Sequence, residues 1–526
     1  MTTRQTLEGK LRAYFPSPGR ILFILIIAVN LFVYLNSFTH IFRHDDWNYW
    51  YWTRGRSFDL RYILDFYSFD RYSGDILLSV GFRPLALVFL GLQKWLFGSN
   101  YVLFHIFTFM LHIAILYALL KILLELKKGF LAYLVVLLFS VYCAVFDFVI
   151  WPNNNFYMLQ LLLMLVSIYL AMRYKKDNHA RNYFFPIIIL LQFPIVLLNE
   201  VGLVFTAALS VFMIAGSGEK PIAKAGRYRY FYFLLPLLTF VVLYILHRLY
   251  GYGYFTKVPY STFLNPDVLS VAFVSTIYAV LKFLKLIFFP HGLSVVYWDA
   301  AWFKFVTSKL RPYDVLLGFT TLGLFLGMLS LKNIRERKAV IMLVGTIALA
   351  FLYIASIGRG VVMSFPPEPR PMISMAAFHY VGSVSRFGYI FGLFFSILSY
   401  AAIDTKRLTP VLKSAGAIAL AVLIFIHSAA ARTEINRVSH LLLPLKLYFD
   451  QVRDFTEEHK KEKDFSFAVE NHPPYIGFAD WWGKAYQYIL EGHFDKYVNY
   501  KDPKYILEYD YEKQRFSVYK KISSGR

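Results

Sequence analysis

Residues 43–50 read Arg-His-Asp-Asp-Trp-Asn-Tyr-Trp and directly follow the first long apolar run of the chain, at 21–40. They place two adjacent carboxylates, Asp45 and Asp46, where a membrane-spanning segment would leave the bilayer. A charged pair inside the bilayer would be costly, so its position at the exit indicates an aqueous pocket at the membrane surface. The rest of the chain is then expected to form a membrane scaffold around that pocket.

The composition of the 526 residues is that of a membrane protein. Hydrophobic residues make up 58% and charged residues 17%, with a mean hydropathy of +0.48, whereas soluble domains average about 25% charged residues. The formal net charge of +22 lies in short loops between apolar runs, where basic residues set membrane topology. Nucleic acid is therefore not an expected partner. With Cys143 as the single cysteine, no intrachain disulfide can form.

Apolar runs of membrane-spanning length recur along the chain. A crossing helix needs about 20 residues, and the segments that approach this length are 21–40, 100–126, 130–150, 156–172, 184–199, 201–216, 230–249, 268–289, 313–331, 339–357, 387–403 and 409–429. The stretch 83–97 is shorter and carries Arg83 and Lys94, so it is expected to lie at the interface. The first run lacks a small-residue cleavage site and is expected to stay as an uncleaved span.

The basic loops predict the orientation of these spans. Clusters of Lys and Arg should be cytoplasmic, and they occur at 127–128, 173–181, 220–229, 332–338 and 406–407. With a cytoplasmic N-terminus in a cell's inner membrane, the Asp45-Asp46 loop and the segments near 150, near 200 and at 358–386 face outward. The alternation of cytoplasmic and outer loops fails between residues 250 and 312. There, either the segment 268–289 is re-entrant or the count is wrong by one.

The predicted fold is an all-α polytopic membrane domain over residues 1–430, with an outer loop at 41–99, and a small soluble α/β domain over 431–526 outside the cytoplasm. From Arg432 onward the chain has 16 Lys and Arg against 15 Asp and Glu, so this tail is nearly neutral. Residues 444–461 are expected to form an amphipathic helix. Alternating stretches at 465–470, 504–511 and 515–519 are expected to be strands, the last two in a hairpin.

Three acidic positions emerge on the outer face in this scheme: the Asp45-Asp46 pair, Asp147 and Glu200. A solvated loop explains the pair alone equally well, but convergence on one face of an acid-poor domain favours a site with a carboxylate as general base. For His105 on the second span, packing in the core is the simpler account. Side chains that could contact a sugar or an acceptor are Trp47, Tyr49, Trp151, Asn154 and His105.

Arginines on the same face run against the tendency of positive charge to lie inside. They are Arg83, at the start of the interfacial stretch, and Arg359, Arg370 and Arg386, around the outer loop 358–386. Guanidinium groups match phosphate oxygens, so arginines beside carboxylates suggest a site that binds a phosphate and moves a proton. Pairing with lipid headgroups or with the outer acids is the alternative for each arginine alone. Asp45-Asp46 with Asp147 could hold a divalent ion, but metal dependence stays open.

The order of these features resembles the GT-C fold of integral-membrane glycosyltransferases, especially the protein O-mannosyltransferase-like and ArnT-like branches. A first span is followed by Asp-Asp, then by Arg-Pro-Leu at 83–85, Leu-Phe-Gly-Ser-Asn at 96–100 and Phe-His at 104–105. Asp147 with Trp151 resembles the family's second acidic loop. Residues 198–203, LNEVGL, resemble a Ser-Lys-Glu-x-Gly-Leu stretch with Asn in place of Lys, and 385–389, SRFGY, resemble an Arg-Tyr segment.

The resemblance implies transfer of a sugar from a polyprenyl phosphate to an acceptor on the outer face, with inversion at the anomeric carbon. The acceptor could be a protein, a lipid or a polysaccharide. Catalysis would fall to Asp45, Asp46, Asp147 and Glu200, and binding of the donor phosphate to Arg83, Arg386, Arg370 and Arg359. A transporter or flippase, or a polymerase, of lipid-linked saccharides is the alternative. Transporters commonly show internal repeats with broken helices, and no repeat stands out in this sequence.

Overall fold

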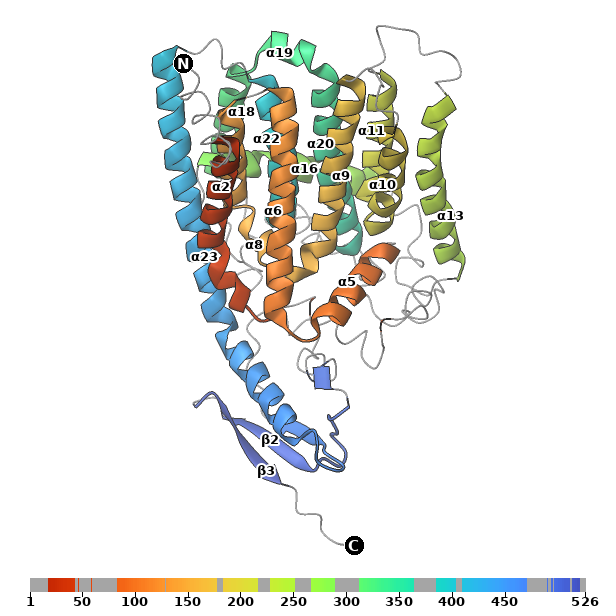
Figure 1. Ribbon diagram of the computed structural model, residues 1–526, viewed down its shortest axis with the longest axis vertical. Coiled ribbons are helices and arrows are strands. Elements are labelled where there is room, and N and C mark those ends of the chain that lie inside the picture. Colours follow the sequence, from red (N-terminus) through yellow and green to blue (C-terminus); the bar gives the residue numbers. More distant parts are fainter. Residues whose placement is uncertain are drawn as a thin grey trace, which may run out of the picture.

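The computed structural model describes residues 18–42, 46, 58, 83–127, 129–176, 183–215, 228–250, 266–288, 312–363, 385–403, 409–470, 490, 493–494, 496–510 and 513–520. Over these residues the chain forms a bundle of roughly parallel and antiparallel helices, and one long helix extends from the bundle to a small sheet (Figure 1). We call the end of the bundle nearer this sheet the sheet end, and the other end the far end.

Most helices run from one end of the bundle to the other and reverse direction at each connection (Figure 1). The first, α2, continues into the 3-10 helix η1 at the sheet end. The elements are α2 (Pro18–Tyr34), η1 (Leu35–Thr39), α5 (Pro84–Phe97), α6 (Tyr101–Leu126), α7 (Leu131–Val141), α8 (Phe146–Val149), η3 (Pro152–Asn154), α9 (Asn155–Lys176), α10 (Phe184–Leu198), α11 (Val201–Ala215), η4 (Tyr228–Phe233), α13 (Leu234–Tyr250), α16 (Pro266–Phe288), α18 (Pro312–Gly327), α19 (Leu331–Glu336), α20 (Lys338–Met363), α22 (Ser385–Ala402) and α23 (Pro410–His459).

The helices have the length and surface of membrane spans. Within the described residues, six segments are long and apolar enough to cross a membrane: Pro18–Thr39, Tyr101–Leu126, Pro152–Lys176, Val268–Ile287, Lys338–Ser356 and Ser414–His440. Shorter apolar helices lie between them. Large apolar side chains such as Phe32, Leu190 and Phe425 are exposed on the outside of the bundle, where lipid would cover them. The chain is therefore a multi-pass membrane protein, as its composition predicts.

The helix α16 crosses its neighbours instead of running beside them (Figure 1). Thr276 Oγ1 lies 3.5 Å from Ser356 Oγ in α20. The ring of Phe283 stacks on that of Phe391 in α22 with 5.6 Å between centroids. Near its end, the backbone carbonyl of Ile287 accepts a hydrogen bond from His427 in α23. One helix therefore contacts α20, α22 and α23 in turn.

The helices on either side of α16 show why the predicted alternation of cytoplasmic and outer loops fails at 250–312. The helix α13 begins at the far end, where Phe233 of η4 meets Phe185, and ends towards the sheet end (Figure 1). The helix α18 ends at the far end, where Leu329 bridges to Ile403 after α22. The chain thus passes from α13 to α18 with both connecting ends at the sheet end, and α16 adds no crossing.

A buried polar network joins the helices of the bundle core. Asn30 Nδ2 donates to Ser140 Oγ at 2.8 Å, joining α2 to α7. His112 of α6 lies 3.2 Å from Asn30 Oδ1 through Nε2 and 2.9 Å from the Tyr389 hydroxyl of α22 through Nδ1. The four side chains are fully buried. Because unmet polar groups are expensive in a membrane, this network fixes the mutual register of four helices.

The tail folds against the end of α23. Its sheet has the order β1-β2-β3, with β1 (Phe467–Glu470) parallel to β2 (Tyr505–Asp510) and β2 antiparallel to β3 (Arg515–Lys520). The register pairs Tyr505 with Lys520 and Asp510 with Arg515. The predicted hairpin is thereby confirmed, as is a mostly helical chain with a small α/β tail. The proposed boundary at residue 430 falls inside α23, which runs without a break to His459.

Candidate functional site

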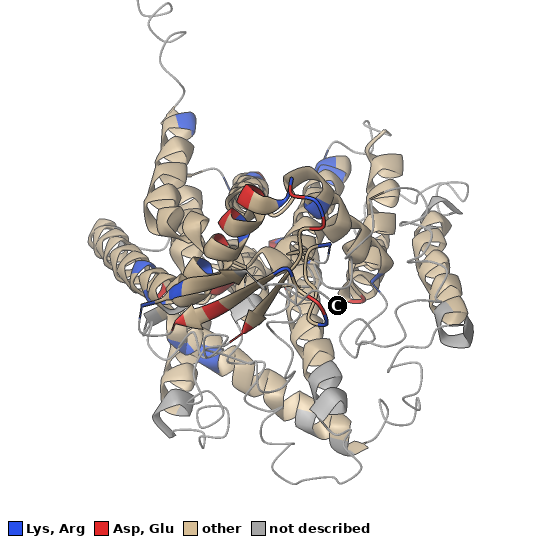
Figure 2. Cartoon of the chain, turned by 90° about the horizontal axis from the view of Figure 1, so that it is seen from below, with Lys and Arg blue, Asp and Glu red and all other residues tan. Residues whose placement is uncertain are grey.

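Most of the described acidic and basic residues singled out in the sequence lie at the sheet end of the bundle. The helix α5 lies there beside the starts of α6 and α9 (Figure 1). The helix α8 and the 3-10 turn η3 complete this end, together with the connection between α10 and α11 at residues 199–200. Viewed from this side, the helices carry few charged residues (Figure 2). The few that are present are therefore set apart from other charged groups on the helices.

The turn that carries Glu200 is held by polar contacts from two helices. Asn199 Oδ1 accepts from the backbone N–H of Val201 at 3.1 Å and so caps the start of α11. Gln160 Nε2 of α9 donates to the carbonyl oxygens of Ile195 and Asn199 at 2.7 and 2.9 Å. These bonds satisfy the last carbonyls of α10 and fix Glu200 in place.

Gly202 allows α10 and α11 to meet closely at this turn. A Cβ atom at this position would collide with the backbone carbonyl of Ile195. The glycine at 202 therefore has a packing reason, because the backbone of α10 comes too close for any side chain at this position.

Glu200 and Arg83 form a two-point ion pair at the start of α5. Arg83 Nε lies 2.9 Å from Glu200 Oε2, and its Nη2 lies 3.1 Å from Oε1. A third bond runs from Arg83 Nη1 to the Tyr157 hydroxyl at 3.0 Å. The side chains of Arg83 and Glu200 are 27% and 30% exposed. The guanidinium is thus oriented by its partners but remains within reach of the aqueous side.

This pairing bears on the roles that the sequence predicts. The sequence assigns Arg83 to the donor phosphate and Glu200 to catalysis, and in the structure the two side chains are bound to each other. A phosphate at Arg83 would have to share the guanidinium with Glu200. Tyr157, which the sequence analysis did not single out, is part of the same group.

Asp147 lies in the short helix α8, whose Phe148 contacts the Tyr157 ring of the same group. The aspartate is 5% exposed. The ring of its neighbour Phe148 lies tilted against those of Tyr157 and Tyr389, with centroids 6.4 and 4.5 Å apart. Tyr389 follows Arg386 by one helical turn. The fold thereby brings α8 and the first turns of α22 together.

The asparagines at 153–155 are buried at the start of α9. Asn155 Nδ2 donates to Gln93 Oε1 of α5 at 2.6 Å, and Asn154 Nδ2 donates to Phe148 O at 3.4 Å. The amide oxygens of Asn154 and Asn155 are buried without a hydrogen-bond partner among the described residues. Unmet buried acceptors are costly, so these two oxygens are suited to a hydroxyl group or a water. Trp151 is buried beside them.

The remaining described candidates are also buried. Asp46 is 5% exposed and His105 is 2% exposed. The ring of His105 lies edge-on to that of His40, with centroids 6.0 Å apart, which agrees with a packed histidine. Asp45, Trp47, Tyr49 and Arg370 lie outside the described residues, as do the side chains of Arg359 and Arg386. Within the part of the chain that is described, no three His, Cys, Asp or Glu residues are grouped to hold a metal.

Two cations inside the bundle were missed by the sequence analysis. Lys282 and Lys285 lie one turn apart on α16 and are 6% and 4% exposed. The Lys282 ammonium is 6.0 Å from the centre of the Tyr278 ring. Lysines within an apolar run are rare and usually functional. The segment KFLK at 282–285 was therefore a usable signal.

Comparisons with known proteins give only distant similarity. No family model and no curated protein matches the sequence. Among solved structures, ArnT from Cupriavidus metallidurans bound to undecaprenyl phosphate aligns over 97% of this chain and 99% of that chain, with 11% identity and a TM-score of 0.43. The Archaeoglobus fulgidus oligosaccharyltransferase in complex with Zn and sulfate aligns over 93% and 67%, with 9% identity and a TM-score of 0.34.

Proposed function

We propose that this chain is a membrane glycosyltransferase that takes a sugar from a polyprenyl-phosphate donor. The observation that carries the proposal is the Arg83–Glu200–Tyr157 group, which holds a guanidinium in a fixed orientation at one end of an apolar bundle. A cation held in this way suits a phosphate leaving group. The order of sequence motifs from the first span to Phe104-His105 supports the same assignment.

The chemistry follows from the groups around that cation. The bond between the anomeric carbon and the donor phosphate oxygen breaks while a bond from the acceptor oxygen forms on the opposite side of the sugar, which inverts the centre. Negative charge builds on the departing phosphate, and Arg83, with Arg386 and Arg370, would stabilise it. The acceptor proton would pass to Asp45, Asp46 or Asp147. Asn154 and Trp151 are suited to contact the sugar ring.

The test uses the full-length chain in vesicles with a radiolabelled polyprenyl-phosphate sugar and a mixture of envelope acceptors. We expect label to move from the donor to an acceptor, and Asp46→Asn and Asp147→Asn each to reduce the rate by about a hundredfold. Asp45→Asn is tested beside them because Asp45 adjoins Asp46. Asp454→Asn, on an exposed part of α23, is the matched control and should keep the full rate.

Unchanged transfer in all three site variants would contradict the role given to the carboxylates but not the transfer activity itself. Absence of any transfer by the unmodified chain would reject the proposal. Movement of the labelled donor across the membrane without any transfer would instead support the transporter or flippase alternative.

A further inference from the structure

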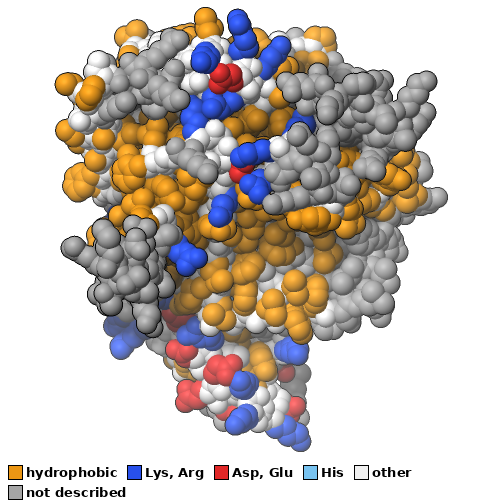
Figure 3. All heavy atoms as spheres, turned by 45° about the horizontal axis from the view of Figure 1, so that its top comes forward, with side chains coloured by type: hydrophobic (Ala, Val, Ile, Leu, Met, Phe, Trp, Pro, Cys, Tyr) orange, Lys and Arg blue, Asp and Glu red, His pale blue; other side chains and the backbone are white. Residues whose placement is uncertain are grey.

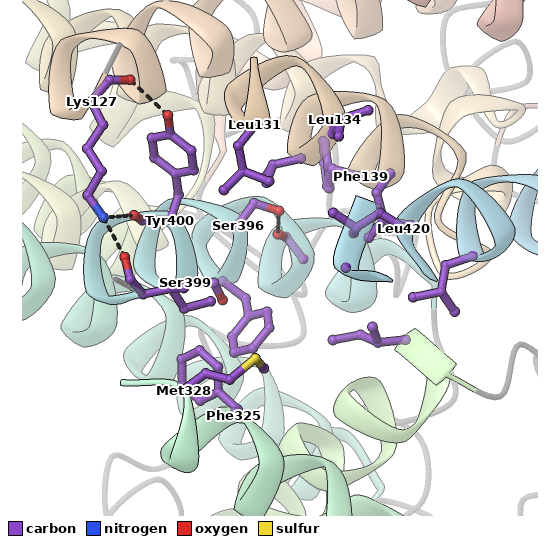
Figure 4. A pocket seen from close by; sticks show the side chains of 18 of the residues that line it. Lys127, Leu131, Leu134, Phe139, Phe325, Met328, Ser396, Ser399, Tyr400 and Leu420 are labelled. Atoms are coloured by element: carbon purple, nitrogen blue, oxygen red, sulfur yellow. Dashed lines mark hydrogen bonds between the residues drawn. The ribbon is translucent and has the colours of Figure 1, made fainter. Parts of the chain in front are cut away.

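A large cavity lies at the far end of the bundle, opposite the candidate site. It has a volume of about 1110 Å³ and is bounded by α7, α18, α22 and α23. Its wall is mainly apolar, and Figure 4 shows the side chains turned towards it from these helices. They include Leu131, Leu134, Phe139, Phe325, Met328 and Leu420. The cavity reaches inward as far as Tyr142 and His427.

A space of this size and polarity needs an occupant. Protein interiors are close-packed, with few voids larger than a water molecule. Water is retained where it finds two to four polar partners, and a mainly apolar wall offers few of them. The helix α23, which forms one wall, is exposed along most of Ser414–His440. The cavity is therefore next to lipid, and a lipid chain is the apolar material at hand.

The rim of the cavity is basic. Lys127, Lys332 and Arg337 line it, against one carboxylate, Glu336. Lys127 Nζ donates to the carbonyl oxygens of Tyr400 and Ile403 at the end of α22, at 3.0 and 2.5 Å. Basic side chains gather at this end with hydrophobic surface directly below them (Figure 3). Positive charge above an apolar space complements a lipid with an anionic head and long chains.

Arg337 is the cation best placed for a headgroup. Its Nη2 donates to the carbonyl oxygen of Leu126 at 3.4 Å, which ties the guanidinium to the end of α6. Its Nη1 is buried and has no hydrogen-bond partner among the described residues. A buried guanidinium nitrogen without an acceptor is costly, and a phosphate oxygen would satisfy it. Ser399 Oγ, also on the wall, is buried without a partner in the described part of the chain.

We propose that this cavity binds an anionic phospholipid of the surrounding membrane. Its phosphate would contact Arg337 and Lys332, and an acyl chain would lie along α7 and α23 towards Tyr142. The site is at the opposite end of the bundle from Arg83 and Glu200, so it is distinct from the proposed donor site. The proposal does not depend on the glycosyltransferase assignment.

The experiment measures lipid binding to the purified full-length chain by native mass spectrometry. The probes are phosphatidylglycerol and phosphatidylcholine with identical dioleoyl chains. We expect phosphatidylglycerol to bind about tenfold more tightly, since it can bring its phosphate to the cationic rim without a positive group of its own. Arg337→Gln should abolish this preference. Arg335→Gln, two residues earlier in the last turn of α19 and outside the cavity wall, should retain it.

A second pair of variants tests the acyl chain and does not involve a charge. Ala419→Phe projects from α23 into the cavity, whereas Ala421→Phe lies outside its wall. The first should weaken binding of both lipids about tenfold or more, and the second should leave it unchanged. Equal binding of the two lipids to the unmodified chain would overturn the proposal. So would equal effects of the two phenylalanine variants, since the lipid would then lie elsewhere on the surface.

Discussion

Arg83 and Glu200 hold each other through two hydrogen bonds although 117 residues separate them in the chain. Lysine offers a compact charge without the planar fork, so Arg83→Lys would keep the charge and lose the geometry. Exposed ion pairs contribute about 0–1 kcal/mol to stability, and a donor to a developing charge contributes about 10²-fold to rate. We therefore expect the melting temperature to stay nearly constant while kcat for sugar transfer falls about a hundredfold.

The matched control for this variant is Arg432→Lys. Arg432 donates to the Phe32 carbonyl at 2.8 Å on the outside of the bundle, away from the site. It should change neither kcat nor the melting temperature by much. A normal kcat in Arg83→Lys would show that the fork is not needed by the reaction.

The network around His112 gives a second prediction at this scale, about stability. Removing His112 by substitution with Leu leaves Asn30 Oδ1 and the Tyr389 hydroxyl without this partner in a buried place. The coupling energy between hydrogen-bonded side chains of membrane helices averages about 0.6 kcal/mol and reaches about 1.7 kcal/mol. We expect the double variant, His112→Leu with Tyr389→Phe, to lose less unfolding free energy than the sum of the losses in the two single variants. Thermal unfolding in detergent measures these losses. Strict additivity of the two variants would contradict the hydrogen bond between them.

The contact between Arg83 and Glu200 could not be predicted from the sequence, whereas the two buried lysines could have been. Sequence placed Arg83 and Glu200 on one face, because each follows or precedes an apolar run. It could not show that they bind each other, since two residues so far apart meet only through the packing of α5 on α10. Lys282 and Lys285 are the opposite case. Their position inside an apolar run is visible in the sequence itself.

At the scale of single elements, the apolar runs predict the helices closely. The expected spans at 100–126, 184–199 and 201–216 correspond to Tyr101–Leu126, Phe184–Leu198 and Val201–Ala215. The reason is physical, since a helix in lipid must be apolar along its whole length. The direction of α16 could not be predicted in this way. A helix that crosses the membrane and one that lies across its neighbours can have the same length and composition.

The orientation of α16 leads to a labelling prediction. Single cysteines replace Tyr250 at the end of α13, Pro312 at the start of α18 and Leu331 at the start of α19, in a Cys143→Ala background. Because α16 adds no crossing, a membrane-impermeant thiol reagent should label positions 250 and 312 from the same side. Leu331 is 82% exposed at the far end and should be labelled from the other side. Labelling of 250 and 312 from opposite sides would mean that α16 crosses.

At the scale of the whole molecule, the long helix α23 connects the membrane bundle to the tail. Gln451 near its end donates to the Gln514 carbonyl at 2.9 Å and accepts from the Phe516 N–H at 3.0 Å. The Tyr448 ring lies 5.1 Å from that of Phe516, between centroids. The β2–β3 hairpin is therefore fixed to the helix that leaves the bundle. The sequence predicts a span at 409–429, a separate amphipathic helix at 444–461 and a hairpin. It predicts neither the one continuous helix α23 nor its contact with the hairpin.

A charged group at the end of α23 makes the stability of the tail depend on pH. Lys504 Nζ and the Tyr505 hydroxyl donate to Glu462 Oε2 at 2.8 and 2.9 Å. Hydrogen bonds from Lys504 and Tyr505 lower the pKa of the Glu462 carboxyl below its usual value, which is about 4.3 in unfolded chains. A lowered carboxyl pKa gives stability that is present above the unfolded pKa and is lost as pH falls through the folded pKa.

The pKa of Lys504 is raised by its hydrogen bond to Glu462, so its share of the stability is lost only at alkaline pH, above its unfolded value of about 10.4. The unmodified tail should therefore melt at a higher temperature than Glu462→Gln at pH 7, and the difference should shrink as pH falls below about 4. Thermal unfolding of the two chains at both pH values measures this difference. Glu457→Gln, which removes a carboxylate from an exposed pair with Lys460 on α23, should show no such change between the two pH values. A difference for Glu462→Gln that persists undiminished in acid would show that its charge does not hold the sheet to the helix.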